Sequence, residues 1–189
     1  RYIEIYNGTG QTIDLSNYAL TLHRNNGNTY VLDLDNSSGD SNNNGFLNSD
    51  EVLIVIKIDS GDLLNENYLD ADNNDVQFIE WSSLSSLNGD DAVELLKNDI
   101  RIDVIGTPGV QDDPWYIDDL LDGTKDHTLV RKDNVLFGST TWSNSSGSSC
   151  SYEEEEGSYQ NIGCGQWIVY DVNTYDYGGS HYCSICENQ

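Results

Sequence analysis

The sequence contains few basic residues and no long apolar run, and both absences narrow its possible partners. It has 8 Lys and Arg against 33 Asp and Glu, which gives a formal net charge of −25 at pH 7. Because nucleic-acid affinity comes largely from Lys and Arg contacts to phosphates, this balance excludes general binding to nucleic acid or anionic lipid. The longest apolar run, residues 52–56, is far shorter than the roughly 20 residues of a membrane-spanning helix. We therefore expect no nucleic-acid partner and no membrane insertion.

Methionine is absent and proline is rare. The 189 residues begin at Arg1 and suit a single domain. Since no Met occurs and the first residue is Arg1, we expect that an N-terminal part was removed or lies outside this sequence. Only 2 Pro accompany 17 Gly and many Asn, a composition that favours turns between short strands.

Alternating apolar and polar residues predict a chain of short strands. The alternation is clearest over residues 2–6, 18–23 and 30–34. Further strands are predicted over 51–58, 76–81, 92–97, 100–105, 128–131 and 166–170. Asn98 and Asp99 tolerate the positive φ of a two-residue turn and predict a hairpin. Only residues 118–121 have a briefly helical pattern, so we predict an all-β antiparallel sandwich or barrel.

Several longer strings, taken together in order and spacing, are more specific than this pattern. They are 2–10 (YIEIYNGTG), 13–20 (IDLSNYAL), 87–95 (LNGDDAVEL), 102–106 (IDVIG), 128–132 (TLVRK) and Trp167 followed by 175–181 (YDYGGSH). In these strings the chain resembles the lamin-tail domain, in the secreted form of bacterial and algal extracellular proteins. The resemblance implies an immunoglobulin-like antiparallel β-sandwich over residues 1–182. It implies an interaction or surface-display module and no particular activity.

The cysteines all fall near the C-terminus. Cys150 and Cys164 bracket an acidic, Ser-rich and Gly-rich stretch, which we interpret as an exposed loop insertion over residues 143–166. Cys183 and Cys186 lie in a short tail, residues 183–189. We favour disulfides over a zinc site. The pairing stays open among three possibilities, with Cys150–Cys164 first and with inter-chain bonds at the tail as an alternative.

Three N-glycosylation sequons agree with an extracellular location. Their acceptor residues are Asn7, Asn36 and Asn144. Together with oxidised cysteines, they indicate a secreted or cell-surface protein.

Residues 40–51 match a calcium-binding loop. The string DSNNNGFLNSDE places oxygen ligands at positions 1, 3, 5, 7, 9 and 12 and glycine at position 6. The predicted ligands are Asp40, Asn42, Asn44, the Phe46 carbonyl, Asn48 through water, and Glu51. A strand pattern rather than a helix follows Glu51, and only two ligands carry charge. We therefore expect modest affinity, with a Kd of about 10⁻⁴–10⁻³ M.

Enzyme motifs are missing. The sequence contains no Gly-x-Ser-x-Gly, no His-Glu-x-x-His and no Gly-x-x-x-x-Gly-Lys. Its three histidines, His23, His127 and His181, are widely separated. We therefore expect a protein that is not an enzyme.

Lamin-tail domains usually have one more strand at the N-terminus, ahead of the segment that matches Arg1 onward, and this sequence does not contain it. Either that strand lies upstream of this sequence, or the sandwich has an incomplete edge that another chain fills by strand addition. We expect a structural or adhesive module that self-associates into a surface layer or filament, stabilised by calcium, disulfides and N-glycans. The alternative is a glycan- or surface-binding module of a larger secreted enzyme, with tryptophans such as Trp115 contacting the sugar.

Overall fold

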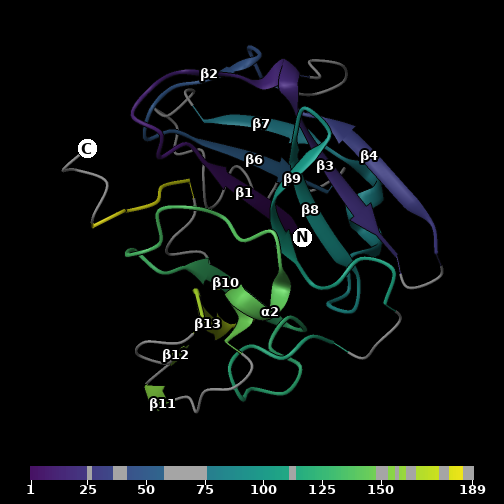
Figure 1. Ribbon diagram of the computed structural model, residues 1–189, viewed down its shortest axis with the longest axis vertical. Coiled ribbons are helices and arrows are strands. Elements are labelled where there is room, and N and C mark those ends of the chain that lie inside the picture. Colours follow the sequence, from purple (N-terminus) through teal and green to yellow (C-terminus); the bar gives the residue numbers. More distant parts are fainter. Residues whose placement is uncertain are drawn as a thin grey trace.

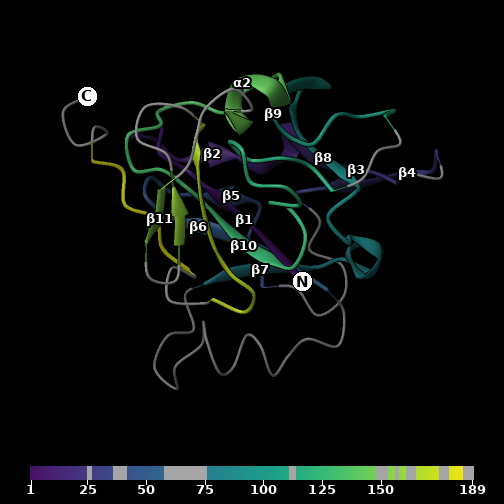
Figure 2. The same cartoon turned by 90° about the horizontal axis from the view of Figure 1, so that it is seen from below.

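The computed structural model describes residues 1–24, 27–35, 42–57, 76–110, 114–147, 153–155, 158–160, 165–174 and 179–184. Most of its regular structure is β-strand, arranged in several sheets (Figures 1 and 2). Its helices within these ranges are short: η1 (Leu15–Asn17), η2 (Ser82–Ser86) and α2 (Trp142–Ser146). None of them is long and apolar enough to span a bilayer. The predicted all-β class is confirmed.

A three-stranded sheet has the apolar run of the sequence at its centre. Its strands, in order, are β1 (Tyr2–Tyr6), β6 (Val52–Ile56) and β7 (Gln77–Glu80). All of β6 is buried, as expected for a strand covered on both faces. β6 runs antiparallel to β1 but parallel to β7, unlike the other strand pairs of the described chain. Residues 57–76 supply the dozen or more residues that a parallel connection needs.

A four-stranded sheet contains the predicted hairpin. Its order is β4 (Thr29–Asp33), β3 (Tyr18–His23), β8 (Ala92–Lys97) and β9 (Ile100–Ile105). Asn98 and Asp99 connect β8 to β9 with φ values of 49° and 62°. These left-handed values are those of a tight hairpin turn, which confirms that prediction. Leu95 pairs with Asp103 but Leu96 pairs with Arg101, so Ile102 is the extra residue of a bulge in β9.

One apolar core lies between these two sheets. Buried side chains reach it from β1, β6 and β7 on one side and from β3, β4 and β8 on the other: Ile5, Leu53, Val55, Ile79, Leu20, Leu22, Leu32 and Val93. A separate cluster on the opposite face of the three-stranded sheet contains Val52, Ile54 and Ile56. Alternate residues of β6 therefore face different clusters, which follows from the period of two in a strand.

The C-terminal part forms a further sheet. Its order is β10 (His127–Arg131), β13 (Trp167–Asp171), β12 (Ser158–Gln160) and β11 (Glu153–Glu155). A third apolar cluster joins β9, β13 and α2 through Val104, Val169 and Trp142. The residues predicted to form a loop insertion thus include two strands. Residues 118–121 form a tight turn closed by an Ile117–Leu120 bridge, so the brief helix predicted there is wrong.

A short pair of strands completes the described structure. β2 (Ile13–Asp14) pairs antiparallel with β5 (Phe46–Leu47). The sequence pattern did not predict this pair, because two residues are too few to show a period. β5 is important here because it lies within the predicted calcium loop.

Candidate functional site

The predicted calcium loop is described from Asn42 onward, and Asp40 lies outside the described residues. The Asn42 backbone exchanges two hydrogen bonds with Phe78, at 3.1 and 3.2 Å. Gly45 has a φ of 82°, which suits the sharp turn that the motif requires at this position. Leu47 is fully buried in the main core. The loop is therefore attached to the sheet at both of these points.

Gln77 of β7 extends into this loop although it is not part of the motif. Its Nε2 donates to the Phe46 carbonyl at 2.7 Å and contacts a Glu51 carboxylate oxygen at 3.5 Å. Its Oε1 accepts from the Asn44 backbone N–H at 3.1 Å. The Phe46 and Glu51 oxygens that the motif assigns to calcium therefore both contact Gln77 Nε2.

The other predicted ligands bond within the loop. The Asn44 side-chain oxygen accepts from the Phe46 N–H at 2.9 Å. Glu51 accepts from the backbone N–H and the side-chain amide of Asn48, both at 2.9 Å. Asn44 would have to turn to bind a cation. Among the described residues, His, Cys, Asp and Glu form no metal-binding group of three or more. Calcium therefore stays a prediction.

Asn7 has a structural role in this fold. It is 2% exposed, and its Nδ2 donates to the carbonyls of Gln11, Leu47 and Asn48 at 2.8, 2.8 and 3.0 Å. Its Oδ1 accepts from the Thr9 hydroxyl at 2.7 Å. An N-linked glycan is attached through Nδ2 and would disrupt these bonds, so the buried Asn7 amide suits a structural role better than glycosylation.

The remaining sequons and cysteines are only partly described. Asn144 is exposed on α2, as a glycan requires, whereas Asn36 lies outside the described residues. Cys183 is 4% exposed and disulfide-bonded. The other three cysteines, Cys150, Cys164 and Cys186, lie outside the described residues. Their pairing stays a prediction.

A polar row crosses the four-stranded sheet. A carboxylate oxygen of Glu94 on β8 pairs with His23 Nε2 on β3, and the other with the Arg101 guanidinium on β9. Thr29 Oγ1 lies 3.4 Å from His23 Nδ1. A hydroxyl, an imidazole and a carboxylate in series are also the parts of a nucleophilic triad. The hydroxyl contact is longer than the roughly 2.6–3.2 Å of an activated nucleophile, and the ion pairs of Glu94 join three neighbouring strands.

Described C-terminal residues contact the side chains of β1, an edge strand of the three-stranded sheet. The Gly179 N–H donates to Glu4 Oε2 at 3.2 Å, and the His181 ring lies 4.8 Å from the Tyr6 ring. Burial and a 2.8 Å hydrogen bond to Asp50 raise the pKa of Tyr6 to about 12. Burial, followed by the charge of Arg131, lowers the pKa of His181. Two neutral rings therefore pack together beside β1.

β4 forms the outer edge of the four-stranded sheet and pairs with β3 alone among the described strands. Leu34 and Asn28, at its two ends, bond to β3 through their backbones. Since bonding alternates along an antiparallel strand, the backbone N–H and C=O groups of Thr29, Val31 and Asp33 point away from β3. Val31 is 61% exposed. Figure 1 shows this strand along the outside of the molecule.

The candidate sites therefore comprise the loop around Gln77 and an edge of β4 that no other described strand pairs with. Gln77 and β4 were not singled out from the sequence. Gln77 reaches the loop only because β7 pairs with β6, and the open side of β4 depends on the strand order. A comparison with known protein families, characterised proteins and solved structures finds no match to this chain.

Proposed function

We propose that this chain is a non-enzymatic extracellular structural or adhesive module that self-associates through the open edge of β4. The single observation that carries this proposal is the outward-pointing backbone of Thr29, Val31 and Asp33. The proposal includes the finer fold, an immunoglobulin-like sandwich of the lamin-tail type, with partners assembling into a layer or filament.

The edge of β4 is well suited to pair with a second copy of itself. In an antiparallel pair centred on Val31, Val31 faces its equivalent, and Thr29 faces Asp33. No like charges stand directly opposite each other in this register. The outward N–H and C=O groups of each copy would then satisfy those of the other.

Within its own sequence, β4 has few of the features that prevent edge pairing. Its sequence, TYVLD, contains no proline, no lysine and no arginine, and Asp33 at its end is the single charge. Its residues include Thr, Tyr and Val, which favour extended pairing. An unprotected edge with a self-complementary register supports an interface between copies.

We expect calcium to favour self-association and a glycan at Asn144 to leave the interface free. With a net charge of −25, two copies repel each other unless salt or bound cations reduce the charge. Calcium in the loop of residues 40–51 would reduce it and would stabilise β5 and its neighbours. An exposed Asn144 would carry a glycan away from β4.

Sedimentation velocity on the intact chain tests the interface. Val31→Pro removes an outward N–H that β3 does not use, so it blocks strand addition and leaves the sheet paired. Val31→Thr is the matched control because it keeps the N–H and the β-branched shape. At an ionic strength of about 0.15 M, where the Debye length is about 8 Å, we expect the wild type and Val31→Thr to associate and Val31→Pro to sediment as a monomer.

Equal association of all three proteins would overturn the proposal, and so would a monomeric wild type at every concentration. Circular dichroism first checks that Val31→Pro is folded. If it is not, Val31→Glu replaces it, because this change keeps the backbone of β4 and places two carboxylates opposite each other in the pair.

A further inference from the structure

A cavity of about 410 Å³ lies between the end of β9, the turn that follows it and α2. This volume is within the range of small-ligand sites, roughly 300–1,000 Å³. Apolar side chains lining it include Val104, Trp115 and Trp142, whereas Thr107, Tyr116 and Ser143 are exposed residues at its rim. The cavity therefore combines aromatic walls with a rim rich in hydroxyl groups.

Packing fixes the aromatic walls in place. Trp115 and Trp142 are 8% and 7% exposed and belong to one apolar cluster. Gly106 has a φ of 77°, and a Cβ atom at this position would lie 2.5 Å from the Trp115 indole nitrogen. Only glycine allows the indole to lie this close to the backbone. The cavity is therefore already formed without a ligand.

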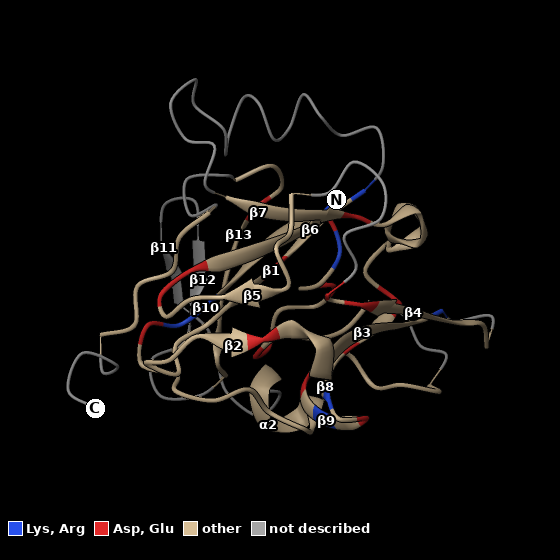
Figure 3. Cartoon of the chain, turned by 90° about the horizontal axis from the view of Figure 1, so that it is seen from above, with Lys and Arg blue, Asp and Glu red and all other residues tan. Residues whose placement is uncertain are grey.

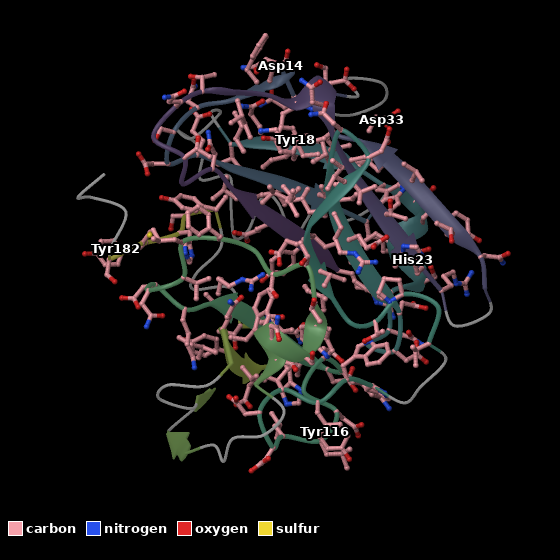
Figure 4. The ribbon with its side chains drawn as sticks, in the orientation of Figure 1. Asp14, Tyr18, His23, Asp33, Tyr116 and Tyr182 are labelled. Atoms are coloured by element: carbon pink, nitrogen blue, oxygen red, sulfur yellow. The ribbon has the colours of Figure 1, made fainter. Side chains whose placement is uncertain are left out.

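Tyr116 provides the accessible aromatic surface. It is 52% exposed and lines the cavity beside Trp115. In Figure 4 its side chain projects from the lower end of the molecule. An aromatic ring offers an apolar face, and its hydroxyl and the neighbouring threonine and serine side chains offer hydrogen bonds. A sugar ring has the matching arrangement, because C–H groups form its faces and hydroxyl groups surround its edge.

Charge argues against an anionic ligand in this cavity. Arg101 is the charged residue among those that line the cavity. Its guanidinium pairs with the buried carboxylate of Glu94 and donates to the Thr140 carbonyl at 3.2 Å. Its charge is therefore already balanced. The net charge of −25 also repels anionic ligands, which argues against nucleotides and acidic glycans.

We infer that this cavity binds a neutral oligosaccharide, with a sugar ring stacked on Tyr116 and the rim hydroxyls bonding its edge. The cavity lies apart from β4, so this inference does not depend on the proposed self-association. It assigns the chain a second function, attachment to neutral glycans of a surface or matrix.

Isothermal titration of the intact chain with hexasaccharides of glucose, mannose, galactose and N-acetylglucosamine tests the inference. We expect millimolar or tighter binding of at least one of them by the wild type. Tyr116→Ala should weaken it about tenfold by removing the stacked ring, and Tyr116→Phe should retain most of the affinity. Tyr182→Ala is the matched control, since Tyr182 is 63% exposed but lies at a different part of the surface (Figure 4).

Three outcomes would overturn the inference. The first is no binding of any of these sugars at millimolar concentration. The second is equal affinity of the wild type and Tyr116→Ala. The third is a larger loss in Tyr182→Ala than in Tyr116→Ala. Sedimentation velocity on Tyr116→Ala tests whether sugar binding and self-association are independent. Self-association through β4 should be unchanged in this variant.

Discussion

Asp118 is a buried carboxylate at a left-handed backbone position. It is 3% exposed and has a φ of 51°, which Asp and Asn tolerate better than most residues. Its Oδ1 accepts from the Gly165 N–H at 3.1 Å, and its own N–H donates to the Ser146 carbonyl at 2.6 Å. Asp118 therefore connects the last residue of α2 to the chain just before β13.

Asp118 should affect stability in a pH-dependent way. Burial raises its pKa, against the opposing charge of Lys132. The folded state therefore holds the Asp118 proton more tightly than the unfolded state does. The contribution of this proton to the free energy of unfolding is fully present below the unfolded pKa of about 3.9. It falls as the pH rises through the folded pKa. At neutral pH the buried charge is therefore a cost.

Two substitutions distinguish the carboxylate's charge from its hydrogen bond. Asp118→Asn keeps an acceptor and suits the positive φ, so we expect equal or greater stability than wild type at pH 7, with the difference vanishing in acid. Asp118→Ala leaves the Gly165 N–H without its acceptor and should lower the free energy of unfolding by about 1–3 kcal/mol. Urea denaturation from pH 3 to pH 8 measures both. A less stable Asp118→Asn at pH 7 would contradict this explanation.

Residue roles were the hardest feature to predict from the sequence. Asn7 matches a glycosylation sequon, yet its amide bonds to the backbone of Leu47 and Asn48, which lie 40 and 41 residues along the chain. Gln77 lies in an ordinary strand pattern, yet it bonds the Phe46 carbonyl. Such contacts depend on strand pairing between distant segments, which local patterns do not contain.

Strands were predictable where their residues alternate or form a buried apolar run. The predicted ranges 18–23, 92–97 and 100–105 coincide with β3, β8 and β9. Sheet order and the parallel pairing of β6 with β7 were not predictable, since they depend on packing between sheets. α2 was missed because its sequence, WSNSS, contains residues that usually favour turns.

The loop of residues 40–51 should respond to calcium as a unit. With calcium at about one hundred times its Kd, the folded state gains about 2.7 kcal/mol, which raises Tm by about 5–10 °C for a chain of this size. Glu51→Gln should abolish most of this gain by removing a charged ligand. Differential scanning calorimetry in calcium, magnesium and chelator measures it.

Asp126→Asn is the control for the calcium experiment. It makes the same charge change at an exposed residue with a φ of 54°, a value that Asn also tolerates. Its response to calcium should match wild type. The calcium prediction fails if Tm is the same with calcium and with chelator, or if Glu51→Gln responds as the wild type does.

The whole molecule is strongly acidic, and this should govern association. Figure 3 shows acidic residues on the sheets and the loops of the described chain. Repulsion between copies extends about 30 Å at 0.01 M salt but only about 10 Å at 0.1 M. We therefore expect self-association to strengthen as salt rises, because pairing through backbone groups is less sensitive to screening than repulsion between net charges.

Amide hydrogen exchange at β4 tests the central claim most directly. Raising the protein concentration in moderate salt should slow exchange at Thr29, Val31 and Asp33, whose N–H groups point outward. Exchange at Tyr30 and Leu32, which pair with β3, should not change. Slowing confined to the outward amides is the predicted result. Equal exchange of those three amides in dilute and concentrated solution would contradict the account.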